Sequence, residues 1–251
     1  MRVIRVRHQR RAFYAALLDN EVQPLDQRLD SQETIPLKEV TVLPLVVPTK
    51  VVCVGLNYHA HAEELGKKVP AEPLLFLKPP SSVVGTGQPI VYPAQSKNVH
   101  YEGELGVVIG RQCRKVSVSQ APEYIFGFCC GNDVTARDLQ NADVQYTRAK
   151  GFDTFCPLGP WIETDFKGKD DLTIHTYLND ELRQEGRTSD MIATPFELVS
   201  FISGIMTLMP GDVVLTGTPP GVGSIQPGDE IKVEIESVGM LINSVSEESP
   251  S

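Results

Sequence analysis

The sequence lacks the features that mark most membrane, secreted and nucleic-acid-binding proteins. No continuous apolar run is long enough to span a bilayer, and the N-terminus alternates charged and apolar residues over positions 2–7, unlike a signal peptide. Acidic residues outnumber basic ones, the formal net charge is −9, and no stripe combines basic with aromatic side chains. We therefore expect binding to neither membrane nor nucleic acid, although a local cluster of cations can still attract a small anion.

Cysteine is also scarce. The five cysteines are an odd number and none belongs to a CxxC pair, a usage typical of a reducing cytoplasm, where we expect the protein to be located. Cys53, Cys129 and Cys130 lie in apolar runs and are predicted to be small core residues, whereas Cys113 is predicted to be more exposed.

The chain length and two proline-rich boundaries predict two unequal parts. At 251 residues the chain can form one sizeable core, or a large domain with a small one. Residues 2–7 alternate with a period of two and residues 12–18 suit a second strand, which predicts a small β-rich module over residues 1–47. The segment 43–49 carries two prolines and suits a boundary, so residues 48–251 are predicted to form the larger domain.

The larger part alternates many short strands with few helices. Two Pro-Gly-Asp turns, at 210–212 and 227–229, each precede a strand. Strands are predicted over residues 50–55, 74–77, 104–109, 125–130, 173–178, 212–216 and 230–236, a short helix is predicted to end at Gly66, and an amphipathic helix is predicted over residues 195–208. This pattern predicts an α+β fold dominated by β-strands, with a frayed tail over residues 247–251.

Two glutamates at the start of an apolar strand are the strongest functional signal. Glu102 and Glu104 are one residue apart, and alternation along a strand places such residues on the same face. Like charges that close repel unless one is protonated or a cation lies between them. Asp133 follows another apolar strand and completes a set of oxygen ligands for Mg²⁺ or Mn²⁺, with Ca²⁺ as a substitute. The alternative, a solvated strand edge, is disfavoured by the apolar flanks.

A histidine and a glutamate three residues apart form a second candidate group. On a helix His61 and Glu64 share a face, and a histidine oriented by a carboxylate is a general base near neutral pH. For an isolated H-x-x-E pattern, a solvated helix face is the alternative. A zinc site made by His59, His61 and Glu63 is a further alternative, but positions i and i+2 of a helix do not converge.

Cations and a glycine-rich loop suggest an anionic ligand. Lys78, Arg137 and Lys150 are each typical surface charges alone, but together with a metal they suit an oxo-acid. The loop 216–223 follows a strand and lacks the Gly-Lys-Ser/Thr ending of a nucleotide-binding loop. Its backbone N–H groups or Thr218 are candidates for holding a carboxylate.

Taken in order, these motifs resemble the fumarylacetoacetate hydrolase superfamily. Each motif is weak alone, but the ordered set, which covers residues 50 to 243, is highly specific. The segments that carry the resemblance are Val-Gly-Leu-Asn-Tyr at 54–58 with His61 and Glu64, Phe-Leu-Lys-Pro at 76–79, Tyr-Glu-Gly-Glu-Leu at 101–105, Gly-Asn-Asp-Val-Thr-Ala-Arg-Asp at 131–138, Lys-Gly-Phe-Asp-Thr-Phe at 150–155 with Gly-Pro at 159–160, and Thr-Gly-Thr-Pro at 216–219.

The resemblance implies a fold, a cofactor and a set of residue roles. It implies a β-roll of mixed sheets, a homodimer, and Mg²⁺ or Mn²⁺ on the three carboxylates. It also implies that His61 and Glu64 lie on a lid that orders over bound substrate. The remaining implied roles are that Lys150 positions a water or stabilises developing negative charge, and that Lys78, Arg137, Gln140 and Thr218 line the substrate pocket.

One departure from the family pattern points to a branch. The longer fumarylacetoacetases supply a further metal carboxylate near the Asn-Tyr segment, where this chain has Leu56. The chain is therefore similar to the smaller bacterial members, which include acylpyruvate hydrolases, oxaloacetate decarboxylases and 2-hydroxyhepta-2,4-diene-1,7-dioate isomerases.

These three chemistries share an enolate that a metal can stabilise as a Lewis acid. We expect an enzyme for small anionic 2-oxo or 2,4-dioxo acids, with C–C bond cleavage by hydrolysis or decarboxylation favoured. Isomerisation of a 2-hydroxyhepta-2,4-diene-1,7-dioate or a 5-carboxymethyl-2-hydroxymuconate is the alternative. An alternative of another class, a non-catalytic homologue that binds metal and oxo-acid, is disfavoured because His61, Glu64 and Lys150 are all present.

Overall fold

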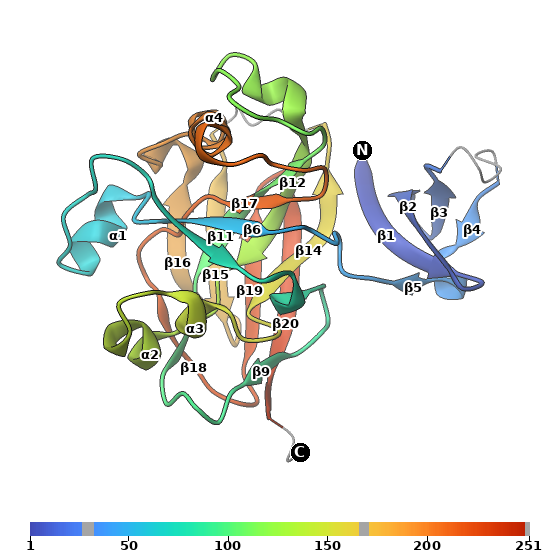
Figure 1. The fold of residues 1–251 in the computed structure, drawn as a ribbon. Coiled ribbons are helices and arrows are strands. Elements are labelled where there is room, and N and C mark those ends of the chain that lie inside the picture. The colour runs from blue at the N-terminus through green and yellow to red at the C-terminus, as the bar shows by residue number, and fades with distance from the viewer. Residues whose placement is uncertain (27–32, 166–170, 249–251) are drawn as a thin grey trace.

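The computed structural model describes residues 1–26, 33–165 and 171–248, and strands dominate it (Figure 1). The strands are β1 (Arg2–His8), β2 (Arg11–Leu17), β3 (Glu21–Pro24), β4 (Ile35–Pro36), β5 (Thr41–Val42), β6 (Val51–Gly55), β7 (Leu74–Lys78), β8 (Val83–Val84), β9 (Ile90–Tyr92), β10 (Val99–Tyr101), β11 (Gly103–Ile109), β12 (Ile125–Asn132), β13 (Thr135–Ala136), β14 (Cys156–Glu163), β15 (Thr173–Leu178), β16 (Glu181–Arg187), β17 (Val213–Leu215), β18 (Gly223–Ile225), β19 (Glu230–Ile235) and β20 (Gly239–Glu247). The α-helices are α1 (His59–Glu64), α2 (Arg137–Ala142), α3 (Thr147–Lys150) and α4 (Pro195–Ile205). The β-dominated α+β fold of mixed sheets is thus confirmed.

The strands that bear the candidate site lie inside the largest sheet. Its order is β4-β3-β2-β1-β14-β12-β11-β17-β6-β7, with β5 paired to β1 and β8 paired to β14. β11 pairs antiparallel with both β12 and β17, whereas β17 and β6 pair in parallel. Every residue of β11 is buried, which explains why its sequence is a nearly continuous apolar run.

A second sheet determines which way the two glutamates point. The five strands β16-β15-β19-β20-β9 form this sheet, and Leu105 of β11 packs with Ile174 of β15 in one hydrophobic cluster. Val108, on the opposite face of β11, belongs to another cluster. Because side chains alternate along a strand, Glu102 and Glu104 point away from the five-stranded sheet.

Gly103, between the two glutamates, lies where the two sheets touch. A Cβ atom there would lie 2.1 Å from Thr176 Oγ1 of β15. Gly103→Ala is therefore expected to lower the free energy of unfolding by about 1–3 kcal/mol, because the sheets must separate or Thr176 must move. Chemical denaturation measures this, with Gly204→Ala as the control. Gly204 lies in α4 with no atom within 4 Å of its Cβ position, so its replacement should be neutral or mildly stabilising. Equal stability of the two variants would contradict this packing.

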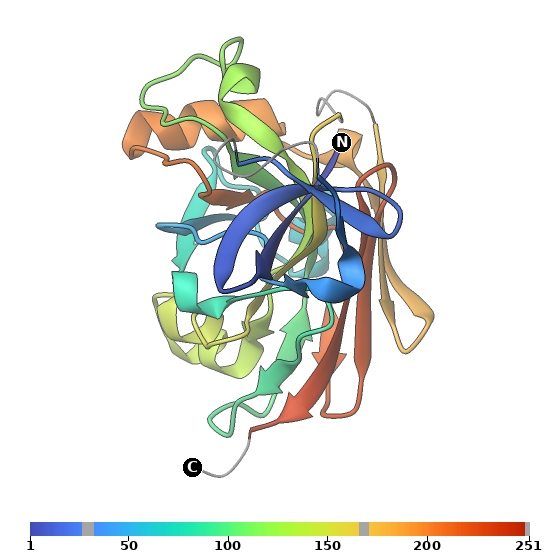
Figure 2. The ribbon, with the colours of Figure 1, turned by 90° about the vertical axis from the view of Figure 1, so that its right-hand side faces the viewer.

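The N-terminal strands extend the large sheet but also have a core of their own. β1 pairs antiparallel with β14 through Arg2 and Glu163, and β2, β3 and β4 continue from β1. Figure 2 shows these strands, in blue, curving across the front of the molecule. Val6, Phe13 and Val22 belong to a hydrophobic cluster confined to this region and its surroundings. The boundary at residue 47 stays a prediction.

A buried aspartate fixes the start of the parallel pair β6 and β17. The carboxylate of Asp212 accepts hydrogen bonds from Thr49 N–H and Oγ1, both at 2.8 Å, from Met209 N–H at 2.9 Å, and from Lys50 Nζ at 2.5 Å. Burial opposes ionisation of this carboxyl, but these donors outweigh it and lower the pKa of Asp212. Its stabilising contribution is therefore present above the ordinary aspartate pKa and is lost as the pH falls through the lowered value.

Asp212→Asn is accordingly expected to lower the free energy of unfolding by about 2 kcal/mol at neutral pH, because part of a charged hydrogen-bond network is lost. The difference from the unsubstituted protein should shrink in acid. Urea denaturation at neutral and acidic pH measures both effects. Asp229→Asn, in the other Pro-Gly-Asp turn, is the matched control, because Asp229 is only half-buried. Losses of the same size in both variants would contradict the role given to Asp212.

Most predicted elements are confirmed to within a few residues. The strand predicted over 173–178 is β15 itself, the helix predicted to end at Gly66 is α1, and the amphipathic helix is α4, which ends at Ile205. No helix in the described ranges has both the length and the apolarity needed to cross a membrane.

One prediction about exposure is wrong, and one about the C-terminal tail is tested only in part. Cys113 is only 2% exposed, because its backbone forms an isolated bridge with Leu208; Cys53, Cys129 and Cys130 are buried as expected. The predicted frayed tail lies partly outside the described residues, which end at residue 248. Within them, Glu247 pairs with Tyr92 and the carboxylate of Glu248 accepts a hydrogen bond from Ala94 N–H at 2.8 Å, so these two residues are held by neighbours.

Candidate functional site

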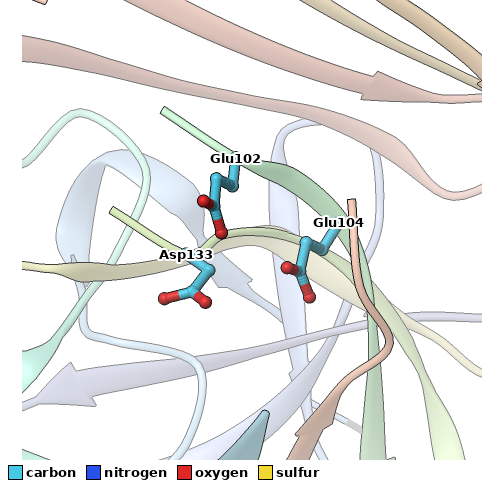
Figure 3. Close-up of side chains that lie close together, drawn as sticks. All are labelled: Glu102, Glu104 and Asp133. Carbon is cyan, nitrogen blue, oxygen red and sulfur yellow. The ribbon is translucent and has the colours of Figure 1, made fainter. Parts of the chain in front are cut away.

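Three carboxylates gather in the interior of the protein. Glu102 directly precedes β11, Glu104 lies in β11, and Asp133 directly follows β12 (Figure 3). One oxygen of each lies within 4.8 Å of the others, and the three side chains are 5%, 2% and 0% exposed. The sequence prediction that these residues meet, and that they do so away from solvent, is confirmed.

The backbone around the carboxylates is tied together by short hydrogen bonds. Glu102 N–H donates to Asn132 Oδ1 at 2.9 Å, and Asp133 N–H donates to the Glu102 carbonyl at 2.8 Å. Gly103 N–H donates to Gln184 Oε1 at 2.9 Å. These contacts hold the start of β11 against the end of β12. The backbone therefore keeps the three carboxylates close together although their charges repel one another.

Three cations lie against this acidic group. Lys150 Nζ donates to Glu102 at 2.8 Å and to Asp133 at 2.6 Å. Lys78 Nζ lies 2.7 Å from Asp133 Oδ1, and Arg137 Nη2 donates a hydrogen bond to Glu102 Oε1. The three cations thus pair with Glu102 and Asp133, and none pairs with Glu104 among the described residues.

The electrostatic environments of the two glutamates differ strongly. Burial would raise the pKa of Glu102, but Lys150 and Arg137 outweigh this and hold it below its usual range. Burial and the nearby charges of Asp133 and Glu102 raise the pKa of Glu104 well above its usual range. The carboxylate of Glu104 accepts a hydrogen bond from Gly217 N–H at 2.8 Å, which does not balance its charge. Glu104 is therefore the carboxylate that most needs a cation.

The residues present fit a divalent metal ion. The three ligands offer oxygen atoms, which hard cations such as Mg²⁺ and Mn²⁺ prefer. Asp133 Oδ1 is buried and has no hydrogen bond within the described residues, although Lys78 is close. In the described part of the chain, Glu102, Glu104 and Asp133 are the one group of three or more potential ligands. These residues could bind a divalent metal, and they do not by themselves select its identity.

A histidine and a glutamate on α1 form the pair that the sequence predicts. His61 Nδ1 lies 2.9 Å from Glu64 Oε2, and His61 is buried. The other oxygen of Glu64 accepts a hydrogen bond from Gly221 N–H at 2.9 Å, which ties α1 to the loop after β17. With a proton on Nδ1, Nε2 is free to accept one. His59 and Glu63 are exposed and do not join His61, so the alternative zinc site is not assembled.

One cavity brings most of the predicted residues together. Eight of the ten predicted site residues line it. These eight are His61, Glu102, Glu104, Asp133, Arg137, Gln140, Lys150 and Thr218. Glu64, which is exposed, and Lys78, which is buried, are not part of this lining but contact His61 and Asp133 respectively. Arg137 also holds Gln140, through a hydrogen bond of 2.6 Å from Nη1 to Oε1.

Lys78 and Lys150 are placed to hold the carboxylates. Lys78 is 1% exposed, and its ammonium also donates to the carbonyl oxygens of Val134 at 3.0 Å and Lys150 at 2.6 Å. Burial opposes the charged form of Lys150, but Asp133 and Glu102 outweigh burial and raise its pKa. In this geometry Lys150 stays a cation at neutral pH, and a contact between Lys78 and substrate stays a prediction.

The glycine-rich loop uses its donors on the protein's own groups. Gly217 and Gly221 donate backbone N–H groups to Glu104 and Glu64, as described above. Thr218 Oγ1 donates to the Gly103 carbonyl at 2.8 Å and accepts a hydrogen bond from Gln184 Nε2 at 2.7 Å. The hydroxyl proton of Thr218 is therefore not free for a ligand. The loop instead positions the carboxylates of Glu104 and Glu64.

Sequence reasoning missed two buried amides that fix this loop. Gln184 is fully buried and joins β16 to the Gly103 backbone, to Thr218 and to the Pro219 carbonyl. The amide of Asn57 donates to the carbonyls of Ala193 and Thr216 and accepts from Ala193 N–H. Asn57 stands in a recognised motif and could have been found there. Gln184 lies in a polar, alternating strand, and no local signal distinguishes it from its exposed neighbours.

Comparisons with known proteins agree with this site. Residues 50–246 match the model of the family "Fumarylacetoacetate (FAA) hydrolase C-terminal", and the chain belongs to this family of enzymes. The human mitochondrial oxaloacetate tautomerase FAHD2A is 43% identical over 223 residues, which cover 84% of this chain and 71% of the human protein. The structure of a 5-carboxymethyl-2-hydroxymuconate delta-isomerase from Mycobacterium smegmatis is 42% identical with a TM-score of 0.90, and a 2-hydroxyhepta-2,4-diene-1,7-dioate isomerase from Mycobacterium marinum has the same values; both alignments cover 100% of each chain.

Proposed function

We propose that this protein is a divalent-metal-dependent enzyme that moves a proton next to the 2-oxo group of a small dicarboxylic 2-oxo acid, of the oxaloacetate or hydroxymuconate type. The observation that carries the proposal is a single cavity lined by both a buried carboxylate triad and the Glu64-oriented His61. The names of the similar tautomerase and isomerases support it, because both reactions shift a proton along a conjugated oxo-acid.

The charges of the site favour a dianion. Glu102, Glu104 and Asp133 offer three negative charges, which Lys78, Arg137 and Lys150 match, so a bound divalent ion and Lys67, which also lines the cavity, leave it with excess positive charge. An oxo-acid with two carboxylates neutralises most of this excess, and electrostatic complementarity of this kind is strong where water is excluded.

The triad residues would hold the metal, which supplies Lewis-acid stabilisation of negative charge on the substrate's 2-oxo oxygen when it is bound. His61 is the group placed to take the proton from the carbon next to the oxo group, through Nε2. Glu64 keeps the histidine ring oriented. Lys150 holds the carboxylates of Glu102 and Asp133 in position.

C–C bond cleavage, the favoured prediction from the sequence, is the second candidate. It is favoured by the same His61–Glu64 pair, because an oriented histidine can also take a proton from water that attacks a distal carbonyl. Decarboxylation needs no such water. Hydrolysis and decarboxylation both break the bond between C3 and C4 and release pyruvate as its enolate, whereas the proton shift breaks a bond between C3 and hydrogen, so all three reactions could use the same carboxylate triad.

A paired assay separates these possibilities. Purified protein loaded with Mg²⁺ or Mn²⁺ is given oxaloacetate, acetylpyruvate or 5-carboxymethyl-2-hydroxymuconate, and both the ultraviolet absorbance of the enol form and pyruvate release are followed. We expect a metal-dependent loss of enol absorbance without pyruvate. Metal-dependent pyruvate release from acetylpyruvate or oxaloacetate would establish the cleavage reaction instead. The absence of any change above the metal-only control would refute the proposed function.

The homodimer implied by the family resemblance is also part of the proposal. Light scattering coupled to gel filtration tests it directly, since a monomer of 27.6 kDa and its dimer are well separated. A protein that remains a monomer at assay concentration would contradict it.

A further inference from the structure

The cations that line the cavity are not equally available to a ligand. Lys67, Arg137 and Lys150 all line it. Lys150 donates to Glu102 and Asp133, and Arg137 donates to Glu102 and Gln140. No ion pair of Lys67 is found within residues 1–26, 33–165 and 171–248. Lys67 is thus the lining cation whose charge the described structure leaves unneutralised.

Local structure explains why Lys67 faces the cavity. The helix α1 ends at Glu64, and Gly66 takes a left-handed conformation with φ of 62°, which reverses the chain. Lys67 N–H then donates to the Ala62 carbonyl at 2.9 Å, so the backbone at Lys67 folds back onto the helix that carries His61. Lys67 and the neighbouring Lys68 are both exposed, but only Lys67 lines the cavity.

The position of Lys67 relative to the triad suits the far end of a substrate. The triad lies on the buried side of the cavity, on the strands of the large sheet, whereas Lys67 is an exposed residue on the α1 side. A ligand whose oxo-acid group lies at the triad therefore points its other end toward the mouth. The lining also includes the apolar Leu56, Leu65 and Leu74 and the uncharged Gln140 and Tyr146, none of which can neutralise a distal carboxylate.

We propose that Lys67 is a specificity-determining residue that binds the distal carboxylate of the substrate and so selects dicarboxylic over monocarboxylic oxo-acids. This inference rests on the proposed function and deepens it. Lys67 and His61 belong to one segment, residues 59–67, in which Lys67 N–H donates to the Ala62 carbonyl, so a carboxylate bound to Lys67 is held by the segment that carries the base. Binding of the distal group is thereby coupled to placement of His61.

Binding measurements with two stable ligands test this. N-oxalylglycine and N-methyloxamate share a carboxylate next to a carbonyl, and only the first has a distal carboxylate. Both are titrated by calorimetry into Mn²⁺-loaded protein. Lys67→Gln is expected to weaken N-oxalylglycine binding roughly tenfold, the loss of one charge-assisted hydrogen bond, while N-methyloxamate binding is unchanged. Lys67→Arg should restore much of the difference, and the matched control Lys68→Gln should behave as the unsubstituted protein.

Each outcome has one meaning. If Lys67→Gln changes neither ligand's affinity, or weakens both equally, the specificity role is overturned while the proposed function stands. If Lys68→Gln has the same selective effect as Lys67→Gln, general surface charge is responsible, and the inference is again overturned. If neither ligand binds the unsubstituted, metal-loaded protein, the proposed function fails, and the inference fails with it. Melting temperatures of all variants show whether they are folded.

Discussion

Glu104→Gln is expected to abolish metal-dependent activity and to weaken Mn²⁺ binding by at least about 100-fold, while the metal-free protein remains folded. The amide keeps the shape of the side chain and one oxygen, but it loses the charge that a divalent cation requires. In the metal-free protein this charge is unfavourable, because burial and the neighbouring Asp133 and Glu102 raise the pKa of Glu104. Its removal should therefore leave the metal-free melting temperature equal or higher.

Two measurements on Glu104→Gln check this. Calorimetric titration with Mn²⁺ gives the affinity, and melting curves with and without Mn²⁺ show whether the metal still stabilises the fold. Glu123→Gln is the control, since Glu123 is exposed and distant in sequence from the triad. Normal metal affinity and normal turnover in Glu104→Gln would show that the metal site is wrongly assigned. A variant that is unfolded without metal would contradict the electrostatic account of Glu104.

His61→Gln is expected to lower kcat by about 10²–10⁴-fold and to leave metal affinity unchanged. The substitution removes the group that takes the proton but keeps a polar side chain that can still reach Glu64. The pair is close enough to orient the ring, with 2.9 Å between His61 Nδ1 and Glu64 Oε2. Glu64→Gln should reduce kcat less, because His61 then keeps its position but loses the carboxylate that stabilises its charged form.

A neighbouring histidine provides the control for His61. His59 lies on the same helix but is exposed, so His59→Gln should keep the full turnover rate. Single-turnover kinetics and Mn²⁺ titration separate loss of chemistry from loss of binding. A His61→Gln variant that retains turnover within threefold of the unsubstituted protein would remove His61 from the proposed mechanism, and so would an equal loss in His59→Gln.

Short-range patterns in the chain contained much of the metal site. Glu102 and Glu104 could be paired because a strand places alternate residues on one face, and this holds in any sheet that β11 joins. His61 and Glu64 could be paired because a helix brings residues three apart together. Asp133 needed an additional assumption, that the strand before it lies beside β11, and the antiparallel pairing of β11 with β12 satisfies it.

Longer-range contacts decided how the cationic and polar residues are used. Lys78 contacts Asp133 because β7 packs against α3 and the Lys78 ammonium also donates to the carbonyls of Val134 and Lys150, which no property of the Phe-Leu-Lys-Pro segment indicates. In the sequence Gln184 is one polar residue of an alternating strand. In the structure its amide accepts a hydrogen bond from Gly103 N–H and donates one to Thr218 Oγ1. Such contacts join residues more than thirty positions apart, so their partners cannot be read from local spacing.

The sequence by itself determined the strand-rich fold class, the family, the cluster of three carboxylates that could bind a metal, and the His61–Glu64 pair. These follow from periodicity and motif order, which act over a few residues and survive small errors in element boundaries. Only the tertiary structure decided that Thr218 has no proton left to donate, that Lys78 and Lys150 support the carboxylates, and that Lys67 is the cation on the cavity wall without a carboxylate partner among the described residues. Each side chain has only a few hydrogen-bond donors and acceptors. Whether they bind another residue or remain free for a ligand depends on which segments the fold brings together.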